Sequence, residues 1–290
     1  MTALASKIKA RTGSPRTGLA GGSRLAARLE TLRQRRELAM IAYLTAGDPT
    51  LEFTEKLILR LAEAGADVFE LGVPFSDPIA DGPVIQRESD RALRSGTTLA
   101  AVLGLAARLR RQSDVPLLLF SYYNPVLQFG LGRFAAEAAG AGVDAVLITD
   151  LTPEEAGDYR AEIGRHGLDT VFLAAPTSSQ ARLRQIANVS RGFVYVVSRC
   201  GVTGPRADVP DDLPQLVARL RRYTKLPLAV GFGISQPEQV RVLAGLADGV
   251  VIGSALVECC ERHQHTQKAA EAAGKLVREL KRAGQPGGGR

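Results

Sequence analysis

Cysteine, aromatic residues and long apolar runs are all scarce in this chain of 290 residues. Its three cysteines, Cys200, Cys259 and Cys260, form no C-x-x-C pair and suit neither a disulfide framework nor a zinc site. They favour a reducing compartment, which we interpret as the cytoplasm. No apolar run reaches the length of a membrane helix, so we expect one large soluble domain without a membrane partner.

Basic residues exceed acidic residues by seven, but the excess is confined to the start of the chain. Residues 1–37 hold nine Lys or Arg against two Glu, whereas the remainder is balanced at 28 of each sign. A basic body that would bind a phosphate backbone is therefore absent, and the few aromatics do not interleave with the arginines. We do not expect nucleic acid as a partner.

Both ends of the chain have the composition of flexible segments. The first 22 residues contain no acidic residue and lack the apolar region of a secretory signal. We interpret residues 1–23 as a basic extension, with a short organellar transit segment as the alternative. Residues 284–290 are rich in glycine and are interpreted as a second flexible tail. The catalytic domain is then predicted to span residues 24–283.

Between these ends the sequence repeats an apolar run, a loop with Gly or Asp, and a segment of helical periodicity. The predicted strands are Met40–Leu44, Val68–Gly72, Leu117–Ser121, Ala145–Thr149, Thr170–Ala174, Phe193–Val197, Leu226–Gly231 and Gly249–Ile252. The predicted helices include Glu52–Ala64, Val84–Arg94, Leu99–Arg111, Arg133–Ala139, Pro153–His166, Ser179–Ile186, Asp211–Arg222 and Pro237–Ala244. Continuous apolar strands that alternate with helices are typical of a parallel sheet. Eight such units predict an α/β fold, a single (β/α)8 TIM barrel with its active site at the carboxyl ends of the strands.

Glu70 is difficult to explain as a structural residue. It lies in the apolar run 67–71, where alternation places it on the same side as Val68, facing the barrel interior. A buried carboxylate without a partner is unfavourable, and desolvation raises its pKa toward the range of a general acid or base. The alternative is a structural carboxylate with a buried partner.

Asp81 is a second candidate with a stronger structural alternative. It stands before Gly82, Pro83 and a helical segment, so its charge could simply favour a helix N-terminus. Spacing alone leaves the structural and the catalytic interpretation equally open.

Two glycine-rich loops follow the last two predicted strands, at residues 231–235 and 253–255. Backbone N–H groups at a helix start bind anions, and these strand ends are the usual phosphate position of such barrels. Phosphate binding is therefore predicted, while a tight turn explains either loop alone. His263 and His265 lie in a polar stretch without a metal-ligand spacing, so we expect a solvated helix end and no metal site.

The strand-end motifs together resemble the tryptophan synthase α subunit, the indole-3-glycerol-phosphate lyase family, from about residue 24 to 280. The segment 69–83, which contains both candidate carboxylates, is the most specific of them. The other matching motifs are Tyr43–Pro49, Tyr122–Pro125, Ser198–Gly204, Gly231–Ser235 and Gly253–Ala255.

The resemblance implies a retro-aldol cleavage of indole-3-glycerol phosphate to indole and glyceraldehyde 3-phosphate, with no metal or organic cofactor in this chain. It assigns Glu70 to the protons of ring carbon C3 and the glycerol hydroxyl, and Asp81 to the indole N–H. The matching substrate-binding positions are Tyr43, Ile85, Tyr195 and Thr203. The matching phosphate-binding positions are Gly204, Gly233, Gly253 and Ser254. The segment 201–212 would be a lid over the substrate.

The resemblance also implies an α2β2 heterotetramer in which indole passes to a pyridoxal-phosphate β subunit that makes tryptophan. The matching interface positions are Asp77, Pro78, Asn124 and Pro125. Two residues depart from the family pattern, since Ala42 and Thr152 stand where proline is common. Thr152 occupies a partner-facing position, which puts the contact with β in question rather than catalysis.

Three other interpretations remain open. A free-standing lyase would release indole without a β partner. Another phosphate-binding barrel, such as an isomerase, would explain the glycine loops but not Glu70 and Asp81. A catalytically idle protein that only activates a β subunit would have lost a carboxylate, and this chain has both.

Overall fold

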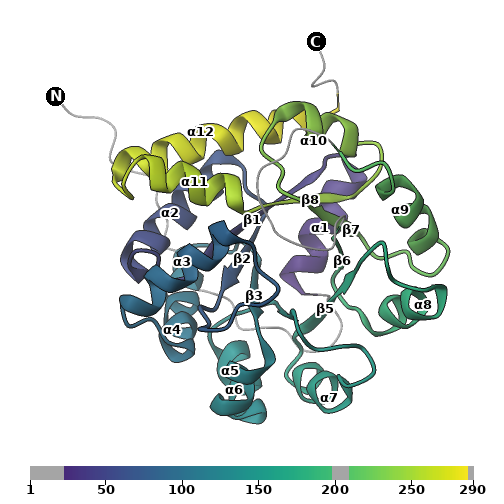
Figure 1. Ribbon diagram of the computed structural model, residues 1–290, viewed down its shortest axis with the longest axis horizontal. Helices are drawn as coiled ribbons and strands as arrows, with labels where there is room; N and C mark the ends of the chain where they lie inside the picture. Colours follow the sequence, from purple (N-terminus) through teal and green to yellow (C-terminus); the bar gives the residue numbers. More distant parts are fainter. Residues whose placement is uncertain (1–22, 198–208, 287–290) are drawn as a thin grey trace.

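The computed structural model describes residues 23–197 and 209–286. In this part of the chain eight parallel strands close into a barrel, each strand pairing with its neighbours in sequence (Figure 1). The strands are β1 (Ala39–Thr45), β2 (Val68–Gly72), β3 (Leu117–Ser121), β4 (Ala145–Ile148), β5 (Asp169–Ala174), β6 (Val194–Val197), β7 (Leu228–Gly231) and β8 (Gly249–Ile252). The predicted TIM barrel is confirmed.

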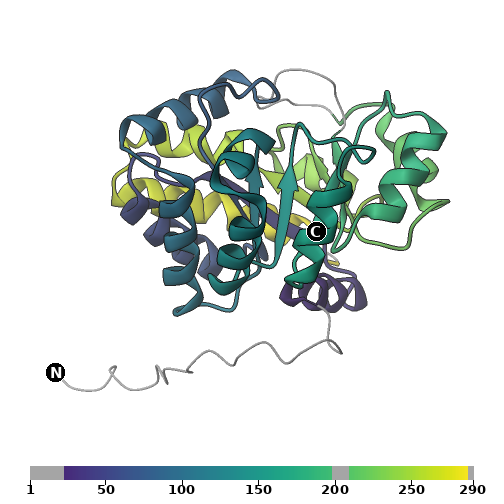
Figure 2. The same cartoon turned by 90° about the horizontal axis from the view of Figure 1, so that it is seen from below.

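Helices surround the barrel, and the first of them lies across one of its ends, as Figures 1 and 2 show. They are α1 (Arg24–Gln34), α2 (Leu51–Ala64), α3 (Pro83–Arg94), α4 (Leu99–Arg110), α5 (Tyr123–Phe129), α6 (Leu131–Gly140), α7 (Gly157–Arg165), α8 (Gln180–Val189), α9 (Leu213–Arg221), α10 (Pro237–Leu243), α11 (Ser254–Arg262) and α12 (Gln267–Ala283). The helix predicted from Pro153 was wrong at its start, because α7 begins only at Gly157. A turn precedes it, in which the Thr152 hydroxyl donates to the Glu155 carboxylate at 2.9 Å.

Helix α1 closes the end of the barrel at which the strands begin, at the bottom of Figure 2. The hydroxyl of Ser23 caps it by accepting the N–H of Ala26 at 3.1 Å. Its buried residues Leu25, Leu29 and Leu32 recur at helical spacing and join the cluster of side chains that fills the barrel interior. The opposite end, with the carboxyl ends of the strands, therefore stays available for a substrate.

Three aspartates lock neighbouring strands together at the end covered by α1. Asp67, just before β2, donates its N–H to Met40 O and accepts the Met40 N–H through its carboxylate, both at 2.8 Å. The same pair of bonds joins Asp144 to Leu117 and Asp248 to Leu228. Each aspartate also has cationic partners, which are Arg28 and Lys281 for Asp67, Arg24 and Arg110 for Asp144, and Arg221 for Asp248.

The last helix is tied into the same end of the barrel. Lys281 of α12 is buried and donates to Asp67 at 2.7 Å and to the Leu38 carbonyl at 3.3 Å. The Leu38 N–H in turn donates to Gly284 O at 3.1 Å. Figures 1 and 2 show α12 running along the outside of the barrel, next to α11.

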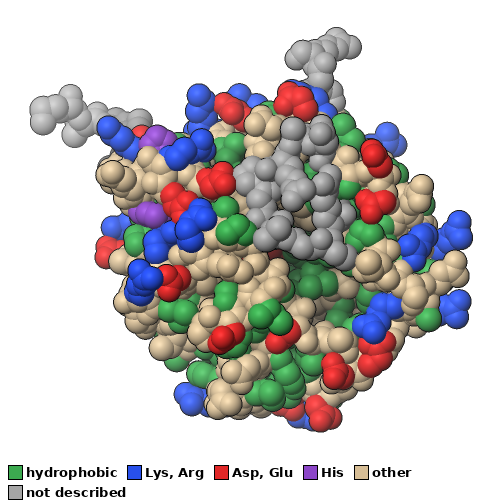
Figure 3. Space-filling view, viewed as in Figure 1, with side chains coloured by type: hydrophobic (Ala, Val, Ile, Leu, Met, Phe, Trp, Pro, Cys, Tyr) green, Lys and Arg blue, Asp and Glu red, His purple; other side chains and the backbone are tan. Residues whose placement is uncertain are grey.

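The surface agrees with a body of balanced charge. Figure 3 shows acidic and basic side chains interspersed over the face that is seen in Figure 1. Within residues 23–197 and 209–286, each helix is too short or too polar to cross a bilayer.

Candidate active site

Glu70 points into the barrel from the middle of β2. Its register partners are Tyr43 on β1 and Leu118 on β3, which both belong to the interior cluster. The Glu70 side chain is fully buried, and neither carboxylate oxygen has a hydrogen-bond partner among the described residues. Burial raises the pKa of Glu70 to about 8, so it holds a proton at neutral pH. The buried partner that a structural role requires is not found in the described part of the chain.

Asp81 is held at the top of the barrel by a tyrosine rather than by a helix end. It lies half-buried in the loop between β2 and α3, and Gly82 occupies the N-cap position of α3. Its Oδ2 accepts a hydrogen bond of 2.9 Å from the Tyr122 hydroxyl. Burial raises the pKa of Asp81 to about 6 and the Tyr122 bond opposes that rise. At neutral pH Asp81 is therefore mainly ionised while Glu70 is mainly protonated, as a pair with separate acid and base roles requires.

Tyr122 is a site residue to which sequence reasoning gave no role, although it belongs to a matched motif. It follows β3, is buried, and its ring packs on Phe75 with centroids 5.1 Å apart. Its hydroxyl accepts the Ala80 N–H at 2.9 Å, so it fixes the backbone beside Asp81 as well as the carboxylate. The available signal was a tyrosine at the carboxyl end of a barrel strand.

Tyr43 and Tyr195 enter the barrel from opposite parts of the sheet in the same way. The Tyr43 hydroxyl lies where a side chain of Gly72 would be, since a Cβ there would be 2.5 Å away. The Tyr195 hydroxyl lies in the same manner over Gly231, at 2.6 Å from such a Cβ. Burial, followed by the charges of nearby carboxylates that include Glu70, holds the pKa of both tyrosines well above its usual value. Both hydroxyls are therefore neutral.

The other predicted substrate positions are only partly described. Ile85, in the first turn of α3, is buried in the same interior cluster as Tyr43 and Tyr195. Thr203 and Gly204, like the rest of residues 198–208, lie outside the described residues.

Backbone groups suited to an anion lie at the ends of β7 and β8. Helix α11 begins at Ser254, with Gly253 as an N-cap that has no side-chain capping bond. Its first N–H groups have no carbonyl partner within the helix, so they are available to an anion. Gly233, in the loop after β7, has a φ of 87°, a conformation that favours glycine.

The four predicted interface positions lie at or near the surface, Asp77 and Pro78 in the loop between β2 and α3, and Asn124 and Pro125 in the first turn of α5. Asp77 and Asn124 are exposed, and Pro78 and Pro125 are half-buried. A surface groove that includes the first two of these positions is lined by Phe75, Ser76, Asp77, Pro78, Ile79, Gln86, Asp90 and Leu93. Ile79 in this groove is 84% exposed, an unusual value for a large apolar side chain.

The interpretation of His265 as part of a solvated helix end was wrong. His263 is exposed, but the side chain of His265 is only 13% exposed and its Nε2 lies 3.4 Å from Asp48 Oδ2. Its ring also packs edge-on against Phe53, with centroids 5.6 Å apart, which removes it from water. Among the described residues there is no group of three His, Cys, Asp or Glu that could hold a metal ion.

Known proteins share this arrangement over almost the whole chain. The family model described as "Tryptophan synthase alpha chain" matches residues 29–285. The chain belongs to this family. Curated tryptophan synthase alpha chains from Geotalea uraniireducens and Solibacter usitatus are 51% and 52% identical, covering 89% and 90% of this chain and 97% of each relative. The chain is accordingly a lyase of tryptophan biosynthesis.

A solved structure of tryptophan synthase from Mycobacterium tuberculosis agrees with this assignment. It is 35% identical with a TM-score of 0.85, over 92% of this chain and 100% of that one. The family was therefore correctly identified from the strand-end motifs, while the roles of individual side chains remain predictions.

Proposed function

We propose that this chain cleaves indole-3-glycerol phosphate to indole and glyceraldehyde 3-phosphate, with Glu70 as general acid and base and Asp81 as the stabilising carboxylate. The observation that carries the proposal is a fully buried Glu70 without a hydrogen-bond partner among the described residues, together with an Asp81 carboxylate that Tyr122 holds in place. Burial raises the pKa of Glu70 to about 8 and that of Asp81 to about 6. A neutral acid and an anion in one site are what this reaction needs.

The proposed reaction begins with proton transfer from Glu70 to C3 of the indole ring. The ring nitrogen then carries positive charge, which the Asp81 carboxylate stabilises by accepting the N–H hydrogen bond. Glu70, now a carboxylate, removes the proton of the adjacent glycerol hydroxyl. The C3–carbon bond breaks, its electron pair returns to the indole ring, and the former hydroxyl carbon becomes the aldehyde. Glu70 ends with the proton with which it started, and Asp81 ends ionised.

Substrate binding is proposed to use the predicted positions on either side of these carboxylates. Tyr43, Ile85, Tyr195 and Thr203 would contact the indole end and the reacting atoms. Gly204, Gly233, Gly253 and Ser254 would bind the phosphate, with the N-terminus of α11 supplying N–H donors. We propose no metal or organic cofactor for this chain, and pyridoxal phosphate only in its partner.

The proposed partner is a tryptophan synthase β subunit in an α2β2 heterotetramer in the cytoplasm. The groove beside Asp77 and Pro78, with the exposed Ile79, supports an interface at the carboxyl end of the barrel. Indole formed at Glu70 would then have a short path to the β subunit.

The decisive experiment measures indole formation by the purified chain alone and with a β subunit. Slow turnover alone and much faster turnover in the complex support the proposal. Equal rates alone and in the complex would indicate a free-standing lyase instead. The absence of indole under both conditions would contradict the assigned reaction. Replacing Asp77 with Ala should reduce the activation by β, whereas Glu271→Ala, a change at an exposed position on α12, should not.

A further inference from the structure

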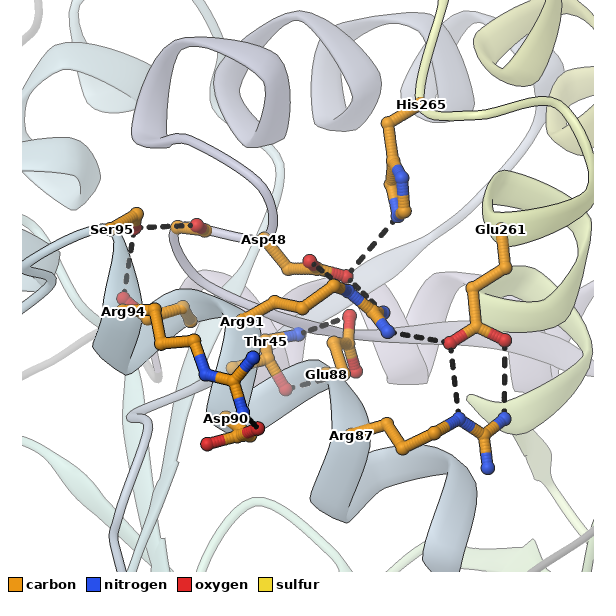
Figure 4. A network of polar contacts seen from close by, with 12 residues as sticks. Thr45, Asp48, Arg87, Glu88, Asp90, Arg91, Arg94, Ser95, Glu261 and His265 are labelled. Atoms are coloured by element: carbon orange, nitrogen blue, oxygen red, sulfur yellow. Dashed lines mark hydrogen bonds and ion pairs between the residues drawn. The ribbon is translucent and has the colours of Figure 1, made fainter.

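A network of polar contacts joins α3 to the end of β1, the loop that follows it, and α11 (Figure 4). Its centre is Glu88 of α3, a buried carboxyl group that faces the end of β1. Glu88 Oε1 accepts the backbone N–H of Thr45 at 3.0 Å, and Glu88 Oε2 lies 2.9 Å from the Thr45 hydroxyl. The mechanism described above makes no use of Glu88.

The network continues from Thr45 into the barrel. The Thr45 Oγ1 atom lies 3.2 Å from the hydroxyl oxygen of Tyr43, and both atoms are buried. Burial, and after it the charges of Asp81, Glu88 and Glu70, raise the pKa of Tyr43, so its hydroxyl lies near all three carboxyl groups. A continuous chain of hydrogen bonds therefore connects the outer carboxyl group to a hydroxyl inside the site.

Hydrogen counting makes this chain directional. Thr45 has a single hydroxyl hydrogen. When Glu88 is ionised, that hydrogen must go to Glu88, so Tyr43 has to donate to Thr45. When Glu88 carries a proton, it donates to Thr45, and Thr45 can donate to Tyr43. The Tyr43 hydrogen is then free to point into the site.

We propose that Glu88, acting through Thr45, sets the direction in which the Tyr43 hydroxyl points, and is thus a positioning residue for the lyase reaction. The inference rests on the proposed function. The Tyr43 hydroxyl is a hydrogen-bond donor to the site when Glu88 is protonated and an acceptor when Glu88 is ionised.

The surroundings of Glu88 bring its protonation within the working range of an enzyme. The groups around it are Asp48 from the β1–α2 loop, Arg91 from α3, Cys260 and Glu261 from α11, and His265 from the following loop. Arg91 is occupied by Asp48, through two bonds of 2.7 Å, and by Glu261 at 2.6 Å. Burial and then Asp48 raise the pKa of Glu88 to about 8, against the bonds from Thr45 and the charge of Arg91.

The test compares Glu88→Gln with the wild type across the pH range. Glutamine reproduces protonated Glu88 at every pH, because its amide can donate to Thr45 while its oxygen accepts the Thr45 N–H. We expect the ratio of kcat/KM, variant over wild type, to rise about two- to tenfold between neutral pH and about pH 9, as expected for one hydrogen bond. In a Tyr43→Phe background the same ratio should be flat with pH.

A ratio that is flat in both backgrounds, or that changes equally in both, would overturn the proposal, because a merely structural Glu88 acts independently of Tyr43. The control is Glu271→Gln, a change at an exposed position on α12 outside the network. Its ratio to wild type should not change with pH.

If Glu88→Gln does not fold, Thr45 carries the test. Thr45→Ser keeps the linking hydroxyl and should leave the effect of Tyr43→Phe unchanged. Thr45→Val removes the hydroxyl. In this variant a further Tyr43→Phe change should therefore have no additional effect on the pH dependence of kcat/KM. Full sensitivity to Tyr43→Phe in the Val variant would contradict the proposal.

Binding separates this proposal from the proposed reaction. The probe is 3-(indol-3-yl)propyl phosphate, which keeps the ring and the phosphate but has no hydroxyl to cleave. The chain contains no tryptophan, so the indole emission of the probe can be followed without a protein tryptophan signal. If the wild type forms no indole, the reaction assignment fails. The proposal for Glu88 then requires that the ratio of the dissociation constants of the probe, Glu88→Gln over wild type, changes with pH. This change should be absent in the Tyr43→Phe background.

Discussion

The Tyr122 hydroxyl donates to Asp81 Oδ2 at 2.9 Å while it accepts the backbone N–H of Ala80 at 2.9 Å. One buried side chain at the end of β3 thereby fixes a carboxylate on the neighbouring loop. Among the described residues Tyr122 is the side chain that donates a hydrogen bond to the Asp81 carboxylate, so the orientation of this carboxylate depends on the tyrosine.

Replacing Tyr122 with Phe should therefore raise the pKa of Asp81, since the hydrogen bond that lowers it is lost. We expect kcat/KM to fall at least about tenfold at neutral pH, the typical loss for a hydrogen bond to a charged group. The acidic limb of the pH profile should move to higher pH. Tyr159→Phe is the control, because its hydroxyl bonds only the Val146 carbonyl at 3.1 Å among the described residues. An unmoved limb in the Tyr122 variant would contradict the assignment.

The wild-type pH profile should be bell-shaped. The proposed reaction requires Asp81 ionised and Glu70 protonated, so kcat/KM should rise with pH through about 6 and fall through about 8. Steady-state kinetics from about pH 5 to about pH 10 measures both limbs. A plateau that extends well above pH 9 would show that Glu70 is not used in its protonated form.

Glu70→Gln should abolish turnover and stabilise the fold at high pH. In the unfolded chain Glu70 titrates near its ordinary 4.5, and burial raises the pKa to about 8 in the folded chain. The folded state therefore loses stability as pH rises between these values, and Gln removes that loss. Urea unfolding should show equal stabilities near pH 4 and a more stable variant near pH 9.

The control for this comparison is Glu63→Gln, which changes an exposed pair with Arg60 at 3.0 Å. Its stability difference from wild type should stay small at both pH values. A Glu70→Gln variant without any pH-dependent gain would mean that Glu70 is ionised in the folded chain.

Gly231→Ala should reduce activity by displacing Tyr195. An added Cβ would lie 2.6 Å from the hydroxyl and 3.1 Å from a ring carbon of Tyr195, so the whole ring has to move. Gly245→Ala is the matched control, because a Cβ there has open space around it. We expect at least about a tenfold loss of kcat/KM for the first change and none for the second. Equal activities would remove Tyr195 from the site.

Asp67→Asn should destabilise the barrel without changing its chemistry. Asp67 is buried and binds Arg28 and Lys281, and loss of its charge removes the nearest anionic partner of the buried Lys281 and leaves Glu37 at 3.5 Å. The expected loss of unfolding free energy is about 3 kcal/mol. Asp90→Asn, in an exposed pair with Arg94, should cost no more than about 0.5 kcal/mol. A loss as small as that of Asp90→Asn would contradict the role of Asp67.

The barrel was predictable because each of its strands is a short apolar run in the sequence. All eight predicted strands coincide with observed strands to within a few residues. Helix α1 was not predicted, since its arginines hide a stripe of only three leucines. The three leucines of α1 pack on the end of the barrel, so the helix could be predicted only once that barrel end was known.

The candidate site shows the same limit. The inward direction of Glu70 follows from strand alternation and was correctly predicted. The contact between Tyr122 and Asp81 joins residues 41 positions apart, and no local pattern encodes it. The burial of His265 against Phe53 likewise depends on how α12 packs on α2 and on α11.

The paired bonds that Asp67, Asp144 and Asp248 make at the amino ends of the strands also determine which side chains face the candidate site at the carboxyl ends. Side chains along a strand alternate between the interior and the helical layer, so a slip of one residue would reverse every side chain of β2. Such a slip would turn Glu70 outward and bring Phe69 or Leu71 into the site. By joining Asp67 to Met40 through two bonds, the chain fixes an alignment of β1 and β2 in which the Glu70 carboxyl group faces the barrel interior.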